Sequence, residues 1–124
     1  MKWSTNITEV RFKLYPKNFY KVRKFYEELL GFTVVKSWDD AQNHKGVMFK
    51  IGKSILEIQA PEKDYVPVKG SGLSLEVKNV KNLWKKLKNN VNITQPIQDN
   101  PWGDTSFGIA DPEGFEIKFF TKQK

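Results

Sequence analysis

Residues 18–32 read NFYKVRKFYEELLGF, and residues 79–93 read NVKNLWKKLKNNVNI. The two stretches begin with Asn18 and Asn79, which stand 61 positions apart. Asparagine is a favoured N-cap residue, because its side chain accepts a hydrogen bond from a backbone N–H of the first helical turn. In both stretches apolar residues then recur at helical spacing. The pattern predicts two amphipathic helices at equivalent places in a repeated unit.

The same offset of 61 positions extends to strand-like segments on both sides of the helices. The matched apolar pairs there are Phe12 with Leu73, Leu14 with Leu75, Phe32 with Ile93, Leu56 with Ile117, and Ile58 with Phe119. The alignment needs no gap. A register that holds through helix and strands predicts two similar folding units, in which any site has pairwise equivalent positions.

In each unit the apolar pattern predicts a strand, a helix and three further strands. The expected strands cover residues 7–15, 32–38, 47–51, 54–59, 73–77, 91–97, 105–110 and 115–121, and residues 39–45 are expected to form a polar loop. The turns Gly52-Lys53 and Asp111-Pro112-Glu113-Gly114 would join the last two strands of each unit.

Neither unit, at about residues 7–60 and 70–121, would bury enough core by itself. We therefore expect one α+β domain over residues 1–124. Its tandem βαβββ modules would form an eight-stranded mixed sheet curved around a cleft, with the helices on the outer face.

The composition limits both the chemistry and the compartment. The 124 residues include no cysteine, which removes thiolate nucleophiles, thiolate metal sites and disulfides, and which fits a reducing cytoplasm. The first residues, MKWSTNITEV, contain no apolar run long enough for a signal peptide or a membrane span. We expect a soluble, cytoplasmic protein without a membrane partner.

The formal net charge of +7 raises the question of nucleic-acid binding. The densest basic stretch, Lys81 to Lys88, falls on the side of the second helix away from its apolar residues, which is typical of a solvated helix face. No known nucleic-acid signature lies nearby. We expect no nucleic-acid partner, although the positive charge favours an anionic small ligand.

Alternation along the strands separates a face covered by the helices from an open face. The residues expected on the open faces include Arg11, Lys13, Met48, Lys50, Ile55, Glu57, Gln59, Gly72, Ser74, Glu76, Phe107, Ile109, Glu116, Lys118 and Phe120. Charged groups on the inner face of a sheet are costly unless they are paired or hydrated. These faces therefore either meet solvent or surround a ligand cleft.

The tandem βαβββ order, residues 25–32 (FYEELLGF) at the end of the first helix, and residues 111–114 (DPEG) before the last strand resemble the vicinal oxygen chelate superfamily. That superfamily includes glyoxalase I, extradiol dioxygenases, and fosfomycin and bleomycin resistance proteins. The resemblance covers about residues 7–121.

The resemblance implies four metal-ligand positions, one on the first and one on the last strand of each unit. They fall here on Arg11, Glu57, Gly72 and Lys118. Only Glu57 could bind a divalent ion, because arginine stays cationic, glycine has no side chain and lysine would have to lose its proton. We expect no metal and no other cofactor, and we expect Glu57 to pair with Lys118 or Arg11 in place of the ion.

Other metal sites find little support in the sequence. The single histidine, His44, is expected to be an exposed loop residue, so a site with two histidines and one carboxylate cannot be built. An all-oxygen site from Glu57, Glu76 and Glu116 is conceivable, but it would compete with the neighbouring cations Arg11 and Lys118.

A metal-free member is most similar to the drug-binding resistance branch, in which a dimer forms aromatic-lined clefts. Residues 100–104 (NPWGD) are similar to a stretch common in that branch. Trp102 would then lie at the cleft mouth, with Trp38 as a second flat surface. Alternatively, Trp102 is a loop aromatic that caps the core. Proteins of this branch that bind cationic drugs tend to be acidic, whereas this chain is basic. The positive charge favours a carboxylate-bearing ligand.

The leading hypothesis is a homodimer that binds or sequesters a small anionic or aromatic molecule without a metal. One alternative is a metal-dependent lyase, isomerase or dioxygenase with an atypical site, in which Glu57 is the candidate catalytic base. Another is a regulatory domain that senses a metabolite. The residues expected to bind the ligand are Arg11, Met48, Lys50, Glu57, Trp102, Phe107, Lys118 and Phe120.

Overall fold

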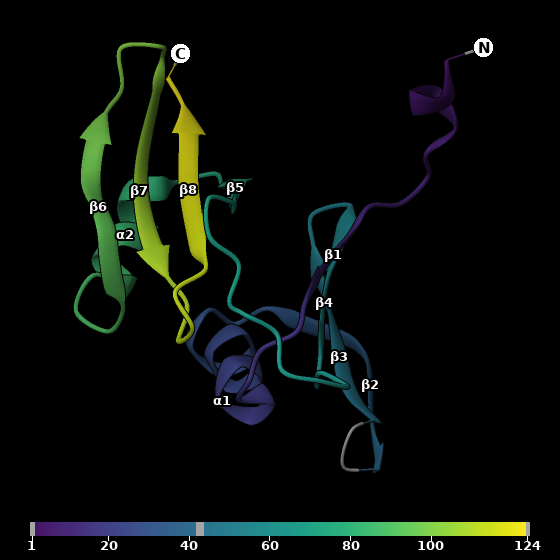
Figure 1. Cartoon of the computed structure of the whole chain (residues 1–124). Helices are drawn as coiled ribbons and strands as arrows, with labels where there is room; N and C mark the ends of the chain where they lie inside the picture. The colour runs from purple at the N-terminus through teal and green to yellow at the C-terminus, as the bar shows by residue number, and fades with distance from the viewer. Residues whose placement is uncertain (1, 42–43, 124) are drawn as a thin grey trace. The chain divides into compact units, whose positions relative to one another are not determined.

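The computed structural model describes residues 2–41 and 44–123 and confirms the α+β repeat (Figure 1). The chain forms two compact units, Met1–Val66 and Pro67–Lys124, and each carries its own four-stranded sheet. The eight expected strands are present. The expectation of one domain around a shared cleft concerns the arrangement of the two units and stays a prediction.

The first unit follows the predicted order of strand, helix and three strands. Its elements are a 3₁₀ turn (Trp3–Asn6), β1 (Arg11–Leu14), α1 (Phe19–Lys24), a π-helical turn (Phe25–Leu29), β2 (Thr33–Ala41), β3 (His44–Ile51) and β4 (Ser54–Gln59). The strand order is β1-β4-β3-β2, with β1 parallel to β4 and the other pairs antiparallel.

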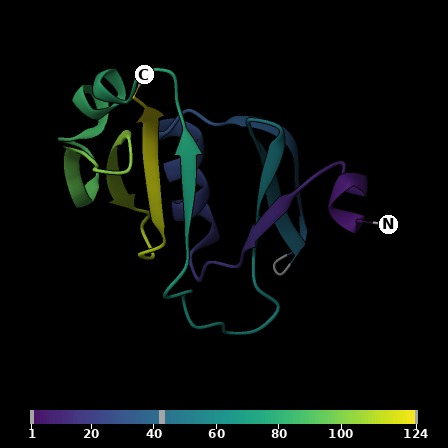
Figure 2. The same ribbon diagram turned by 90° about the horizontal axis from the view of Figure 1, so that it is seen from above.

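The second unit repeats this arrangement. Its elements are β5 (Gly72–Glu76), α2 (Val80–Leu87), β6 (Asn92–Asp99), β7 (Asp104–Ala110) and β8 (Glu116–Lys122). The strand order is β5-β8-β7-β6, and β5 is parallel to β8, which lies beside it in Figure 2. Parallel first and last strands are what a βαβββ module produces when its helix crosses back over one face of the sheet.

Both predicted helix starts are confirmed. The Asn18 side chain accepts a hydrogen bond from the backbone N–H of Lys21 at 3.1 Å, and Asn79 accepts one from Asn82 at the same distance. Gly31, just beyond the first helix, has φ of +69°, which suits a residue that ends a helix. No helix in the described ranges has the length and hydropathy to cross a membrane.

Each helix segment covers one face of its own sheet. The ring of Tyr26, fully buried in the π-helical turn, lies 6.2 Å from the ring of Phe49 on β3. Trp84 on α2 packs edge-on against Phe107 on β7 with ring centroids 5.2 Å apart. The largest fully buried side chains are Tyr26, Phe49, Phe107, Leu56, Ile58, Ile109, Ile117, Val22 and Val47. These residues form the apolar layers beneath the helices.

The predicted offset of 61 positions is wrong for the third strand of each module, β3 and β7. Phe49 pairs with Leu56, and the equivalent pair in the second unit is Ile109 with Ile117. Phe49 and Ile109 stand 60 positions apart rather than 61. The cause is loop length, because β3 and β4 are joined by Gly52-Lys53, whereas residues 111–115 separate β7 from β8.

This shift corrects the predicted facing of β7. Residues directly opposite each other in an antiparallel pair project from the same side of a sheet. Phe107 lies opposite Phe119, so Phe107 and Ile109 belong to the helix-covered face and are fully buried there. Their predicted place on the open face is therefore wrong.

The turn at residues 111–114 is confirmed and is held by one carboxylate. The backbone N–H of Gly114 donates to the carbonyl of Asp111 at 2.9 Å. The Asp111 side chain accepts bonds from the backbone N–H groups of Glu113 at 2.8 Å and Phe115 at 3.0 Å. Asp111 is only 3% exposed, so these bonds satisfy a buried charge.

Two predicted boundaries near the first sheet are wrong. The first strand begins at Arg11 rather than at residue 7, since its pairing with β4 starts there, and Ile7 and Val10 are exposed. The polar loop at 39–45 is mostly strand. Opposite charges on Asp39 and Lys45 face each other across the β2–β3 pair, which favours its extension. Residues 42 and 43 of the predicted loop lie outside the described residues.

Candidate functional site

The open face of the first sheet carries a buried carboxylate. Glu57 is in the middle of β4 and is 3% exposed. Its Oε1 lies 3.7 Å from an Nη atom of Arg11 on the parallel neighbour β1, and its Oε2 accepts a hydrogen bond from the Gln59 side-chain amide. Arg11 also bonds Glu9 through Nε at 3.0 Å. One guanidinium thus stands between two carboxylates.

This arrangement contains the ion pair expected between Glu57 and Arg11. The Glu57 Oε1 atom has no hydrogen-bond partner among residues 2–41 and 44–123, so the Arg11 charge is its main compensation. The alternative partner, Lys118, belongs to the second unit, and that pairing stays a prediction. Met48 is opposite Glu57 and Lys50 is opposite Ile55, so both lie on the predicted open face.

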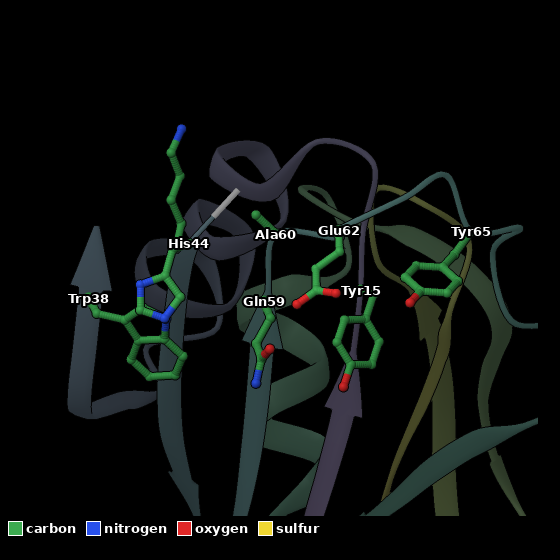
Figure 3. Close-up of a pocket in the computed structure, with 8 residues that line it drawn as sticks. Tyr15, Trp38, His44, Gln59, Ala60, Glu62 and Tyr65 are labelled. Atoms are coloured by element: carbon green, nitrogen blue, oxygen red, sulfur yellow. The ribbon is translucent and has the colours of Figure 1, made fainter. Parts of the chain in front are cut away.

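A pocket of about 430 Å³ opens at the end of this face. Figure 3 shows Trp38 and His44 on one side of it, Tyr15 and Tyr65 on the other, and the side chains of Gln59 and Glu62 between them. The complete lining is Tyr15, Trp38, His44, Lys45, Gln59, Ala60, Glu62 and Tyr65. The volume falls within the range of small-molecule sites.

The backbone of β3 positions Trp38. Trp38 lies opposite Gly46 in the β2–β3 pair. A Cβ atom at Gly46 would lie within 3.0 Å of three atoms of the indole ring, the farthest of them at 2.7 Å. Only glycine leaves room for the indole to lie flat across the sheet, and this placement turns one face of Trp38 into a pocket wall. His44, 6.5 Å from Trp38 between ring centres, is bonded to Asp40.

The opposite wall combines a strand end with the connector after β4. Tyr15 follows Leu14, the last residue of β1, and its ring centroid lies 5.4 Å from that of Tyr65 with the planes inclined at 47°. Tyr65 and Glu62 belong to the connector. Two tilted aromatic rings at this distance attract each other, which fixes the connector over the end of the sheet.

The open face of the second sheet holds three other predicted site residues. Lys118 lies opposite both Ser74 and Gly108, and Phe120 lies opposite Glu76. Gly72 lies at the start of the same face, opposite Glu116. Gly72 therefore matches Arg11, and Lys118 matches Glu57, with the offset of 61 positions intact. Phe107 is absent from this set because it lies beneath α2.

Trp102 occupies the tip of a polar turn. The Gly103 backbone N–H donates to the Asn100 carbonyl at 3.1 Å. The buried Asn100 side chain donates to Asp104 at 2.7 Å and to Ser106 at 2.8 Å. These bonds fix the turn but leave Trp102 74% exposed, so it does not cap the core. Its predicted place at a cleft mouth stays a prediction.

The sequence interpretation missed most of the aromatic pocket. Tyr15 continues the alternation of Arg11 and Lys13, and Gln59 continues that of Glu57, so their shared face could be predicted. Glu62 and Tyr65 follow a proline in a segment without periodicity, and no sequence signal places them. In the described part of the chain, no group of three or more His, Asp or Glu residues could hold a metal ion.

Comparisons with known proteins agree with the fold. Residues 10–119 match the family described as the Glyoxalase/Bleomycin resistance protein/Dioxygenase superfamily. The sequence matches no curated protein.

Similar solved structures carry the same fold. A superfamily member from Sphaerobacter thermophilus is 21% identical with a TM-score of 0.76, and the alignment covers 91% of this chain and 95% of that chain. TioX from Micromonospora sp. ML1 is 17% identical with a TM-score of 0.74, covering 92% and 98%. Lactoylglutathione lyase from Agrobacterium tumefaciens is 18% identical with a TM-score of 0.70, covering 90% and 91%. At these identities the likeness concerns the fold.

Proposed function

Since the chain belongs to the Glyoxalase/Bleomycin resistance protein/Dioxygenase superfamily, we propose that it binds a small molecule with a flat or aromatic body, without a resident metal ion. The observation that carries this proposal is the aromatic pocket between Trp38 and Tyr15 on the open face of the first sheet. Binding or sequestration, as in a resistance protein, is the function that such a surface supports best.

The residues at the family's ligand positions do not fit a divalent ion. Arg11 and Lys118 supply cations, Gly72 supplies no donor, and only Glu57 is a carboxylate. The Glu57 oxygens are already directed to Arg11 and to the Gln59 amide. A cation that approached Glu57 would meet the positive charge of Arg11 within 4 Å. This donor set supports a binding function that needs no metal chemistry.

The pocket has features expected of a binding site. Its walls are indole and phenol rings, which offer large apolar contact area at low conformational cost. Gln59 and Glu62 add polar groups that can orient a ligand. The Trp38 ring is held by close contact with the backbone at Gly46, so this wall is formed before a ligand arrives.

A homodimer is part of this proposal. The N-terminal arm before β1 exposes Trp3, Ile7 and Val10, whose relative exposures are 75%, 63% and 56%. Apolar side chains gathered on one arm are typical of an association surface. Light scattering coupled to size-exclusion chromatography would give twice the 14.5 kDa chain mass, and a monomer at all concentrations would contradict the dimer.

The test of the binding function combines metal analysis with a fluorescence titration. Protein purified without chelator is expected to contain no stoichiometric divalent ion. Indole-free aromatic probes such as benzyl alcohol and benzoate should quench tryptophan emission, and the response should disappear in Trp38→Phe but persist in the matched control Trp102→Phe. A stoichiometric metal that the probe requires, or a response that Trp38→Phe leaves unchanged, would refute the proposal.

A further inference from the structure

We propose that the aromatic pocket selects a protonated amine, that is, an organic cation carried on a small apolar or aromatic body. This inference rests on the proposed function, because it names the class of ligand for the same pocket. It departs from the anionic ligand that the net charge of +7 favours. Three local features carry it: the aromatic faces, the orientation of one amide, and the balance of charges around the opening.

The aromatic faces suit a cation. The face of an aromatic ring carries partial negative charge and attracts an ammonium group within about 6 Å of its centre, with tryptophan the best of the rings. Trp38 forms one wall of the pocket and Tyr15, in contact with Tyr65, forms the other (Figure 3). An amine bound against either wall would meet an electron-rich surface.

The buried carboxylate determines what Gln59 presents to the pocket. An ionised carboxylate only accepts hydrogen bonds, so Gln59 must direct its NH₂ group to Glu57. One N–H of this group is used by Glu57, and the amide carbonyl oxygen, which cannot bond Glu57, is available to a ligand beside the second N–H. Glu57 thereby orients Gln59 so that its acceptor oxygen is directed away from the carboxylate, and an acceptor suits a ligand that donates, as an ammonium group does.

The charges at the opening point the same way. Glu62 lines the pocket, and its carboxylate lies between Gln59 and Tyr15 in Figure 3. In residues 2–41 and 44–123 no basic side chain forms an ion pair with Glu62. Lys45 also lines the pocket, but its ammonium lies over the ring of Tyr20, 4.7 Å from the centroid.

The remaining basic group does not reverse this balance. His44 is bonded to Asp40, whose carboxylate would compensate an imidazolium. Lys13 lies on the same face, opposite Glu57, but it is exposed to solvent, and solvent and salt screen exposed charges beyond about 8 Å at physiological ionic strength. Among the charged side chains of the lining, Glu62 is negative, and the ammonium of Lys45 is directed to the ring of Tyr20.

The experiment compares three probes of similar size: benzylamine, which is cationic at pH 7, benzyl alcohol, which is neutral, and benzoate, which is anionic. Binding is followed by the shift of the Trp38 indole N–H signal in ¹H–¹⁵N spectra, assigned with Trp38→Phe. Benzylamine should bind about three- to thirtyfold more tightly than benzyl alcohol, from one cation–π contact and one exposed ion pair.

Two variants separate the charge from the pocket. Glu62→Gln should reduce the ratio of benzylamine affinity to benzyl alcohol affinity about two- to fivefold, whereas the control Asp64→Asn, which changes an exposed connector carboxylate outside the lining, should leave this ratio intact. Equal affinities for all three probes, or a preference for benzoate, would overturn the cation inference while the proposed function stands. If none of the probes shifts Trp38, both are overturned.

Discussion

Replacing Gly46 by alanine would test how the Trp38 wall is held. The added Cβ would lie at most 2.7 Å from three indole atoms, whereas carbon atoms in favourable contact are 3.5–4.0 Å apart. The indole must therefore move by roughly 1 Å or more. Forcing extra volume into a packed contact costs about 1–3 kcal/mol, so Gly46→Ala should destabilise the protein by about that amount.

The effect of Gly46→Ala on stability should change sign when the Trp38 indole is removed. The φ angle of Gly46 is not positive, so its backbone conformation accommodates alanine. In a Trp38→Ala background, Gly46→Ala should stabilise the protein by about 0.4–1 kcal/mol, because it restricts the unfolded chain. The difference between the two backgrounds is the coupling energy of a double-mutant cycle, and the sign reversal identifies steric contact as its source.

Urea unfolding followed by circular dichroism measures all four proteins of this cycle. Gly46→Ala should lower the midpoint in the wild-type background without changing the slope, and raise it in the Trp38→Ala background. The benzyl alcohol titration should weaken in parallel in the first case only. An equal effect of Gly46→Ala in both backgrounds would refute the account of how Trp38 is positioned.

The remaining predictions concern the caps, a turn and the ligand positions. Asn18→Ala should lower the free energy of unfolding, measured in urea, by about 0.5–2 kcal/mol, whereas Asn18→Asp should retain most of the wild-type stability because aspartate also caps helices. Equal losses in the two variants would count against the cap. Asp111→Ala removes the acceptor for two backbone N–H groups and should lower the free energy of unfolding, measured in urea, by about 1–3 kcal/mol. It should not change probe binding. The triple variant Arg11→His, Gly72→His, Lys118→Glu gives each ligand position implied by the family resemblance a metal-binding side chain, and if these positions come together it should bind Zn²⁺ with one-to-one stoichiometry in calorimetry. A triple variant that folds but binds no Zn²⁺ would show that these four positions are not the metal positions of this chain.

Features that depend on short stretches of sequence were predictable. Asn18 and Asn79 cap their helices as expected, since capping involves only the next three residues. The open-face placement of Arg11 and Glu57 follows from strand alternation and from an offset that holds in the first and last strands of each module. The family resemblance rested on the same local patterns.

Features that depend on loop lengths and non-local contacts were not predictable. The longer connection at residues 111–115 shifts β7 by one residue, which moves Phe107 from the open face to the core. Glu62 and Tyr65 reach the pocket only because Tyr65 packs on Tyr15, at the far end of the module. His44 was expected in a loop, yet strand pairing extends to it.

The most direct test of metal-independent binding is a titration of chelator-dialysed protein with benzylamine, read from the Trp38 indole N–H signal. The signal should shift with the same midpoint before and after addition of Zn²⁺, because the Trp38 indole is positioned by its close contact with the backbone at Gly46. A shift that appears only when metal is added, or that affects Trp84 or Trp102 and leaves Trp38 unchanged, would contradict the account.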